Sequence, residues 1–254
     1  MSVLKGEGKV PILFGSISIP AGSVIHRGYL ARPDLTGEWP TVVLVPSAWG
    51  VTSSAKDLAR RLARQGMAVV APDLYRGHQP PRGAPREQAV AAARALPAGR
   101  ALADLEDIVD FISDPGGSWS NAAAGFGVAG FGEGGRHVAA LGARHGGTPV
   151  ALVGARLRAP DPGGFAGGPY PLDVIEDLAG PVLGLSGRVD EAAPIDDVME
   201  LRRRAPHAEW VLYEGAGADF YDDYLEGYDA AAHKDALERL TAFFEKHLQV
   251  LIPQ

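Results

Sequence analysis

The sequence predicts a single α/β domain with a mostly parallel sheet of about seven or eight strands flanked by helices. Short runs of β-branched residues alternate with longer amphipathic runs along the 254 residues, and this alternation is typical of successive βαβ units. The run TVVLV at 41–45 is continuously apolar, as in parallel strands buried on both faces. Since no repeat, linker or low-complexity tract interrupts the pattern, residues 1–254 are expected to fold as one domain.

The first half of the chain is predicted to supply an antiparallel edge and the first βαβ units. Strands are predicted at residues 15–19, 24–31, 41–45 and 67–71, of which the first two are antiparallel. Helices are predicted over residues 54–66, 86–95 and 99–113. Ser54 and Asp57 have the spacing of a capping box at the start of the first helix, and Gly66 marks its end.

The second half continues the alternation of strands and helices. Strands are predicted at residues 126–129, 149–153, 181–185 and 209–213. Helices are predicted over residues 133–145 and 195–204, followed by a long helix at the end of the chain. One face of that last helix is apolar, which makes it amphipathic, and is formed by Ala236, Leu240, Phe243, Phe244 and Leu248.

Composition and charge argue against several classes of function. The formal net charge of −7 is unfavourable for a nucleic-acid or anionic-membrane surface, because phosphate binding needs clustered lysine and arginine. No apolar run approaches the roughly 18–20 residues of a membrane span. Residues Met1 to Gly8 lack the apolar core of a secretory signal, so the cytoplasm is the expected compartment.

The sequence contains no cysteine, which excludes disulfides, thiolate metal sites and a cysteine nucleophile. The seven histidines show neither HxH nor HExxH spacing, so no metal site is expected.

The most informative segment is Val128-Ala-Gly-Phe-Gly-Glu-Gly-Gly135, where a predicted strand turns sharply into a helix. In α/β-hydrolases such a turn, the nucleophile elbow, presents a serine or cysteine above the sheet. Gly130 and Gly134 have the small side chains that let strand and helix approach closely, so the nucleophile position falls on Gly132. Glycine carries no nucleophile, and it adopts positive φ with little steric cost.

This segment and its surroundings resemble the dienelactone hydrolase family, whose elbow reads Gly-aromatic-Cys-x-Gly-Gly. Gly130, Phe131, Gly134 and Gly135 match that pattern. The other similar segments, in order, are TVVLVPSAWGV (41–51), DLARRLARQGMAVVAPDLY (57–75), SGRVDEAAP (186–194), YEGAGADF (213–220) and AHKDALERLTAFFEKHL (232–248). The resemblance covers nearly the whole chain and implies the α/β-hydrolase fold of that family.

The resemblance also implies which positions held the catalytic groups, and most of them are changed. Asp190 and Pro194 match the family's Asp-x-x-hydrophobic-Pro acid motif, whereas Ala218 stands at the histidine of Gly-Ala-x-His-Gly-Phe. Ser47 stands where a glutamate commonly follows the third strand. Loss of a nucleophile or its base typically costs on the order of 10⁶ in kcat, so hydrolysis through a covalent triad is not expected.

Three carboxylates, Glu133, Asp190 and Asp219, are the candidate catalytic groups at the altered site. One of them, with a pKa raised by burial, could act as a general acid or base in a cyclisation, dehydration or isomerisation. Water activated on Asp190 or Glu133 would instead give weak ester or lactone hydrolysis. Alternatively, Glu133 caps its helix, Asp190 is a structural acceptor and Asp219 is solvated. The chain would then be a non-catalytic ligand-binding or scaffold protein.

The expected ligand is a small organic molecule, of ester, lactone or polyketide-like character. Its predicted contacts are Ser47, Trp49, Phe131, Gly132, Ala218, Phe220 and Tyr221. Residues 219–229 (DFYDDYLEGYD) are rich in acids and tyrosines, and fit either a lid over the cleft or a loop before a helix. A homodimer is the default expectation for a small cytosolic chain.

Residues 130–135 (GFGEGG) also fit the dinucleotide fingerprint GxGxxG, with Arg156 and Arg158 placed to meet a 2′-phosphate. The motif is not in the first βαβ unit, however, and Glu133 would face the pyrophosphate. No cofactor is therefore expected.

Overall fold

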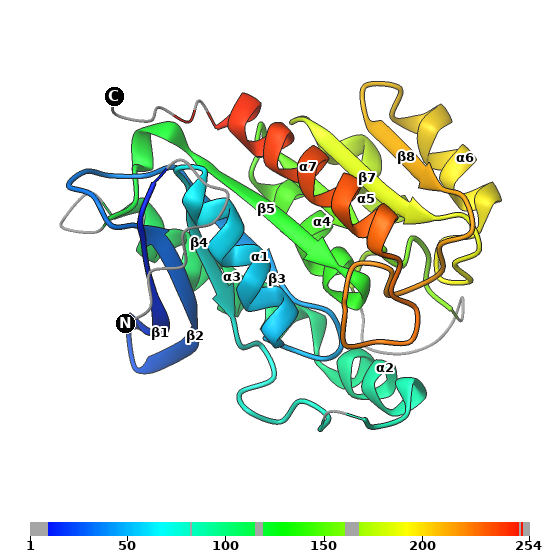
Figure 1. Cartoon of the computed structure of the whole chain (residues 1–254), viewed down its shortest axis with the longest axis horizontal. Helices are drawn as coiled ribbons and strands as arrows, with labels where there is room; N and C mark the ends of the chain where they lie inside the picture. Colours follow the sequence, from blue (N-terminus) through cyan, green and yellow to red (C-terminus); the bar gives the residue numbers. More distant parts are fainter. Residues whose placement is uncertain (1–9, 82, 115–118, 161–167, 249, 251–254) are drawn as a thin grey trace.

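The computed structural model describes residues 10–248 and 250, apart from residue 82 and residues 115–118 and 161–167. Its central element is one eight-stranded sheet with the order β1-β2-β4-β3-β5-β6-β7-β8 (Figure 1). The strands are β1 Ile12–Ala21, β2 Val24–Pro33, β3 Thr41–Val45, β4 Ala68–Pro72, β5 Phe126–Phe131, β6 Val150–Val153, β7 Val182–Gly187 and β8 Glu209–Tyr213. The segment Met1 to Gly8, in which no secretory signal is expected, lies outside the described residues.

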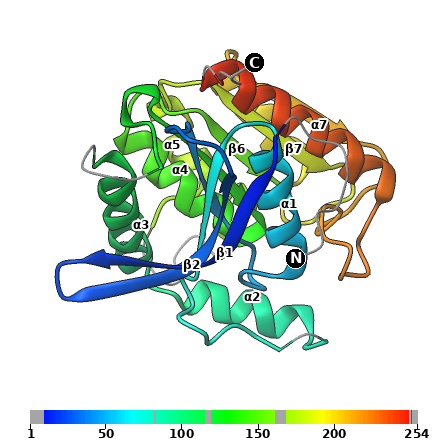
Figure 2. The same ribbon diagram turned by 60° about the vertical axis from the view of Figure 1, so that its left-hand side comes forward.

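The strand directions confirm the predicted fold class. β1 and β2 form an antiparallel hairpin at one edge, and β2 is antiparallel to β4. All pairs from β4 across to β8 are parallel. Figure 2 shows the hairpin at the edge of the sheet.

Helices cover both faces of the sheet (Figures 1 and 2). The α-helices are α1 Ser53–Arg64, α2 Arg86–Ala95, α3 Ala98–Ser113, α4 Gly135–Arg144, α5 Pro171–Val174, α6 Ile195–Arg204 and α7 Ala230–His247. Short 3₁₀ turns among the described residues are η1 Ala122–Ala124, η2 Gly132–Gly134 and η3 Ile175–Asp177. α1 and α7 pack on one face, and α3, α4 and α6 pack on the other.

The two faces explain why the central strands are continuously apolar. In β3, Val42 and Leu44 belong to the core under α1 and α7, whereas Val43 and Val45 belong to the core under α3 and α4. Successive side chains of a strand point to opposite faces. Both sets are therefore buried, and the alternation of apolar and polar residues disappears.

The start of α1 differs from the predicted capping box of Ser54 and Asp57. The N-cap is Thr52, whose hydroxyl accepts a hydrogen bond from the Ala55 backbone N–H at 3.2 Å. Asp57 lies one turn later and instead pairs with Arg60 and Arg61. The helix begins one residue earlier than predicted because Thr52, also a residue type that caps helices, supplies the cap.

No helix in the described part of the chain combines the length and apolarity that crossing a membrane requires.

Candidate functional site

The strand order creates a crevice at the carboxyl ends of the strands. From β3 the chain goes to β4 on one side, and then to β5 and its successors on the other. Ligands of open α/β sheets bind outside such a switch point. Figure 1 shows α2 and the orange segment after β8 at this edge. An ion pair between Arg86 of α2 and Asp219 joins the two segments.

The turn after β5 is built around Gly132, which has φ +52°. A Cβ placed on Gly132 would lie 2.9 Å from the hydroxyl oxygen of Tyr221 and 3.4 Å from the Cβ of Ser47. The ring of Tyr221 is buried and packs edge-on against Phe131, with 5.1 Å between the ring centroids. The phenol of Tyr221 therefore occupies the space in which a side chain at position 132 would lie.

The Tyr221 hydroxyl is a hydrogen-bond donor at this turn. Burial raises the pKa of Tyr221 well above its usual value, and the nearby carboxylates of Asp219 and Asp222 raise it further. The phenol stays protonated, and it donates to Asp219 Oδ1 at 3.4 Å. The remaining cavity beside Gly132 measures about 20 Å³, room for roughly one water molecule.

A much larger cleft lies next to this turn. Its volume is about 890 Å³, which is within the usual size range of small-molecule sites. Its walls come from the loops after β3, β4, β6, β7 and β8, and include Trp49, Arg86, Arg156, Asp190, Ala218 and Asp219. The open space is therefore beside Asp190 and Ala218, and the space at Gly132 is closed.

Asp190 is a buried carboxyl group in the wall of this cleft, with 3% of its surface exposed. Its Oδ1 accepts a hydrogen bond from the Ala192 backbone N–H at 2.8 Å. Its Oδ2 is buried and has no hydrogen-bond partner among the described residues. Burial raises the pKa of Asp190 and the charge of Asp219 adds to the shift, while the Ala192 N–H, Arg86 and Arg156 oppose it. Asp190 is thus a carboxyl group whose ionised form is poorly stabilised.

The substitution Asp190→Asn is expected to raise the free energy of unfolding at pH 7 by up to about 1 kcal/mol. The pKa of Asp190 is higher in the folded chain, so ionisation disfavours the folded state above that pKa. The gain should shrink as the pH falls from 7 towards 4, because the folded chain takes up a proton on Asp190 as the pH falls towards its raised pKa. Urea unfolding at pH 7 and at pH 4 measures this gain in the free energy of unfolding. Asp110→Asn, on the exposed face of α3, is the matched control. A loss of stability at pH 7 would contradict this account.

Glu133 is buried at the turn and lines the small cavity rather than the large cleft. Its Oε1 accepts from the Nε of Arg156 at 3.1 Å and from the Nε of Arg94 at 3.4 Å. Glu133 therefore holds two arginines in place. The hypothesis that Glu133 caps its helix did not predict these ion pairs.

The family assignment follows from comparison with known proteins. The family model described as "Dienelactone hydrolase family" matches residues 26–248. The chain belongs to the dienelactone hydrolase family. It is 33% identical over 230 residues to a carboxymethylenebutenolidase of Rhodococcus opacus, a match that covers 87% of each chain. It is 32% identical over 246 residues to a candidate carboxymethylenebutenolidase of Yersinia pestis, covering 94% of this chain and 90% of the relative.

Solved structures agree with this assignment to the dienelactone hydrolase family. The crystal structure of a candidate dienelactone hydrolase from Klebsiella pneumoniae subsp. pneumoniae superposes with a TM-score of 0.82 and 28% sequence identity. The match covers 93% of this chain and 99% of the other. The fold is thus the α/β-hydrolase fold of this family.

Asp219 has φ +66°, which is uncommon for a residue with a Cβ. In the dienelactone hydrolase pattern noted above, glycine stands at this position, and it adopts such a φ freely. Asp219 Oδ2 lies 2.7 Å from the Nε of Arg86, and only 8% of the residue is exposed. Asp219 is therefore held by an ion pair. The alternative that Asp219 is solvated is wrong.

The structure brings some of the predicted ligand contacts to the cleft and buries others. Trp49 and Ala218 line the cleft, whereas Ser47 and Gly132 line the small cavity beside the turn. Phe220 is fully buried against Tyr213 and Tyr221. The rings of Phe131, Phe220 and Tyr221 belong to the core and do not line the cleft, in contrast to their prediction as ligand contacts.

The acidic segment 219–229 is a series of turns that leads into α7 and forms one wall of the cleft. Asp229 is the N-cap of α7, and its carboxylate accepts from the backbone N–H groups of Ala231 and Ala232. Tyr224 is the tyrosine of this segment that lines the cleft. The segment therefore acts as the loop before a helix and, through Tyr224, contributes to the cleft wall.

Arg86, Arg94 and Asp222 were not predicted as site residues. Arg86 and Asp219 are 133 positions apart, so no local pattern joins them. Arg156, considered only for a 2′-phosphate, could have been found because it follows β6 at the carboxyl edge of the sheet.

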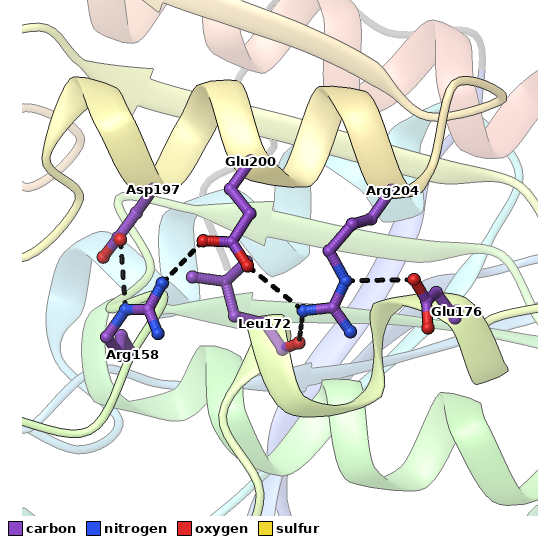
Figure 3. Close-up of polar contacts among 6 residues, drawn as sticks. All are labelled: Arg158, Leu172, Glu176, Asp197, Glu200 and Arg204. Carbon is purple, nitrogen blue, oxygen red and sulfur yellow. Dashed lines mark hydrogen bonds and ion pairs between the residues drawn. The ribbon is translucent and has the colours of Figure 1, made fainter. Parts of the chain in front are cut away.

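Arg158 is engaged elsewhere (Figure 3). It donates to Asp197 and Glu200 of α6, and Glu200 also pairs with Arg204. This network ties the segment after β6 to α6 and leaves Arg158 no part in a phosphate site.

Proposed function

We propose that the chain binds a small organic molecule in the 890 Å³ cleft and uses Asp190 as a general acid or base, without a covalent intermediate. Asp190 carries this proposal, because a buried carboxyl group with a raised pKa and an unpartnered oxygen is suited to proton transfer. Cyclisation, dehydration and isomerisation each need one such group in a shaped pocket. The ligand's class, as an ester, lactone or polyketide-like molecule, is part of the proposal.

The residues around the cleft do not support hydrolysis through a covalent triad. Gly132 offers no hydroxyl or thiol, and Ala218 stands where the family pattern has histidine. No histidine is among the described residues that line the cleft. The proposal is therefore that the ancestral triad is degenerate and that Asp190 is the part of it that still acts.

A second candidate is ligand binding without catalysis. The Tyr221 hydroxyl next to Gly132 favours it, because this phenol fills the position from which a nucleophile would attack. The names of the relatives suggest a third candidate function, which is hydrolysis of a lactone. In this chain a water molecule activated by Glu133 or Asp190 would carry it out. Sites that lack a triad retain about 10³–10⁴-fold catalysis over water, so this hydrolysis would be weak.

Native mass spectrometry of the purified chain, paired with turnover of p-nitrophenyl acetate and a dienelactone, tests these candidates. The proposed function predicts a co-purified small molecule and almost no ester turnover. Ala218→Trp should expel the molecule by filling the cleft, whereas Ala123→Trp at the exposed η1 should not. Ester turnover that Asp190→Asn abolishes would favour the hydrolytic candidate. If neither ligand nor added probe is retained, the cleft is not a binding site and the proposal is wrong.

A further inference from the structure

The charges in the cleft wall are predominantly negative. Its described residues include the carboxylates of Asp190, Glu191, Asp219, Asp222 and Glu226, and the guanidinium groups of Arg86 and Arg156. Both guanidinium groups are already paired, Arg86 with Asp219 and Arg156 with Glu133. The other four carboxylates of the wall form no ion pair with another described residue. The cleft is therefore more favourable for a cation than for an anion.

Among these carboxylates, Asp190 is the one with an unused acceptor in a buried position. Asp222 is equally buried, but its oxygens accept from the Tyr224 backbone N–H at 3.1 Å and the Thr52 hydroxyl at 3.4 Å. Asp190 Oδ2 has no partner among the described residues. A buried acceptor without a donor is costly. Because Oδ2 itself is closed to solvent, an ammonium group at the cleft wall would offset that cost electrostatically.

The rest of the wall suits the organic part of such a ligand. Trp49 reaches the cleft from the loop after β3, and Tyr224 reaches it from the segment after β8. Aromatic faces attract ammonium groups as well as apolar bodies. Pro80, Pro85 and Leu225 supply further apolar surface.

We infer that the natural ligand of the cleft is a protonated organic amine, with its ammonium group next to Asp190 and its apolar body against Trp49 and Leu225. This inference rests on the proposed binding function and narrows it, because Asp190 beside an ammonium group is ionised and can act only as a base. Burial raises the pKa of Asp190 even though Arg86 and Arg156 lower it, so the charge of this carboxylate is only partly compensated. A ligand bearing a carboxylate would meet four unpaired acids and no free guanidinium group among the described residues.

Three probes of one shape test the inference: benzylamine, benzyl alcohol and benzoate, titrated into the full chain at pH 7 by isothermal calorimetry and ligand-observed NMR. The protonated amine is expected to bind at least tenfold more tightly than the alcohol, and benzoate should bind most weakly. Benzoate binding as tightly as the amine would overturn the inference.

Asp190→Asn should remove the preference, so that amine and alcohol bind within about twofold of each other. The matched control Asp110→Asn, on the exposed face of α3, should keep the tenfold difference. If Asp190→Asn fails to fold, the ranking on the unaltered chain decides alone. Equal binding of the three probes, lost in Ala218→Trp, would overturn the amine inference and leave the proposed function standing. Binding of none of them would overturn both.

Discussion

Combining Gly132→Cys with Ala218→His is expected to convert the chain into an ester hydrolase, with p-nitrophenyl acetate turnover at least about 10²-fold above that of the unaltered chain. The turn after β5 already has the positive φ and close strand–helix packing of a nucleophile elbow. Ala218 and Asp190 line the same cleft, so a histidine at position 218 would share that space with the acid expected to orient it. A nucleophile and its base act as a unit, and neither single variant should raise turnover.

The expected gain is smaller than the roughly 10⁶ by which a complete triad exceeds an incomplete one. The new Cβ at position 132 would lie 2.9 Å from the Tyr221 hydroxyl oxygen, and a residue with a Cβ is strained at φ +52°. Adding Tyr221→Phe removes the hydroxyl and should increase turnover further. If neither the double nor the triple variant gains activity, Ala218 is not at the histidine position.

The substitution Gly134→Ala is expected to lower the free energy of unfolding by about 3 kcal/mol, measured by urea unfolding. A Cβ on Gly134 would clash with the carbonyl oxygen of Pro46 and would lie 2.7 Å from that of Val45. Both oxygens belong to the backbone at the buried end of β3, which cannot move without disturbing the centre of the sheet.

The matched control is Gly99→Ala in the first turn of α3, where a Cβ would meet no atom within 4 Å. That change should leave stability unaltered or raise it by about 0.5–1 kcal/mol, because alanine loses less backbone freedom than glycine in a helix. Equal losses in the two variants would show that close approach at Gly134 does not limit the packing of β3 on α4.

The elements of the fold could be predicted because each has a local pattern. The predicted bounds of α6 and β8 coincide with those in the structure. The helix after β5 was predicted from residue 133, but a 3₁₀ turn precedes α4, which begins at Gly135. Successive glycines favour no single conformation strongly, so the sequence could not separate the turn from the helix.

The site was harder to predict, since it depends on the direction in which loop side chains point. The family resemblance led to Asp190 and Ala218, and the rule that ligands bind at the carboxyl ends of strands led to Trp49; all three line the cleft. Neither the resemblance nor the rule predicts where the side chains of Phe220 and Tyr221 point, and both rings point into the core. Adjacent residues in a turn have no fixed periodicity that would separate inward from outward positions.

The position of the Tyr221 phenol has an evolutionary consequence. A mutation that restores cysteine at position 132 alone meets the Tyr221 hydroxyl and a strained backbone, and it finds no histidine at position 218. The intermediate is destabilised and gains nothing that selection could retain. Under the proposed loss of the triad, reversion requires several substitutions at once, and epistasis between positions 132, 218 and 221 opposes it.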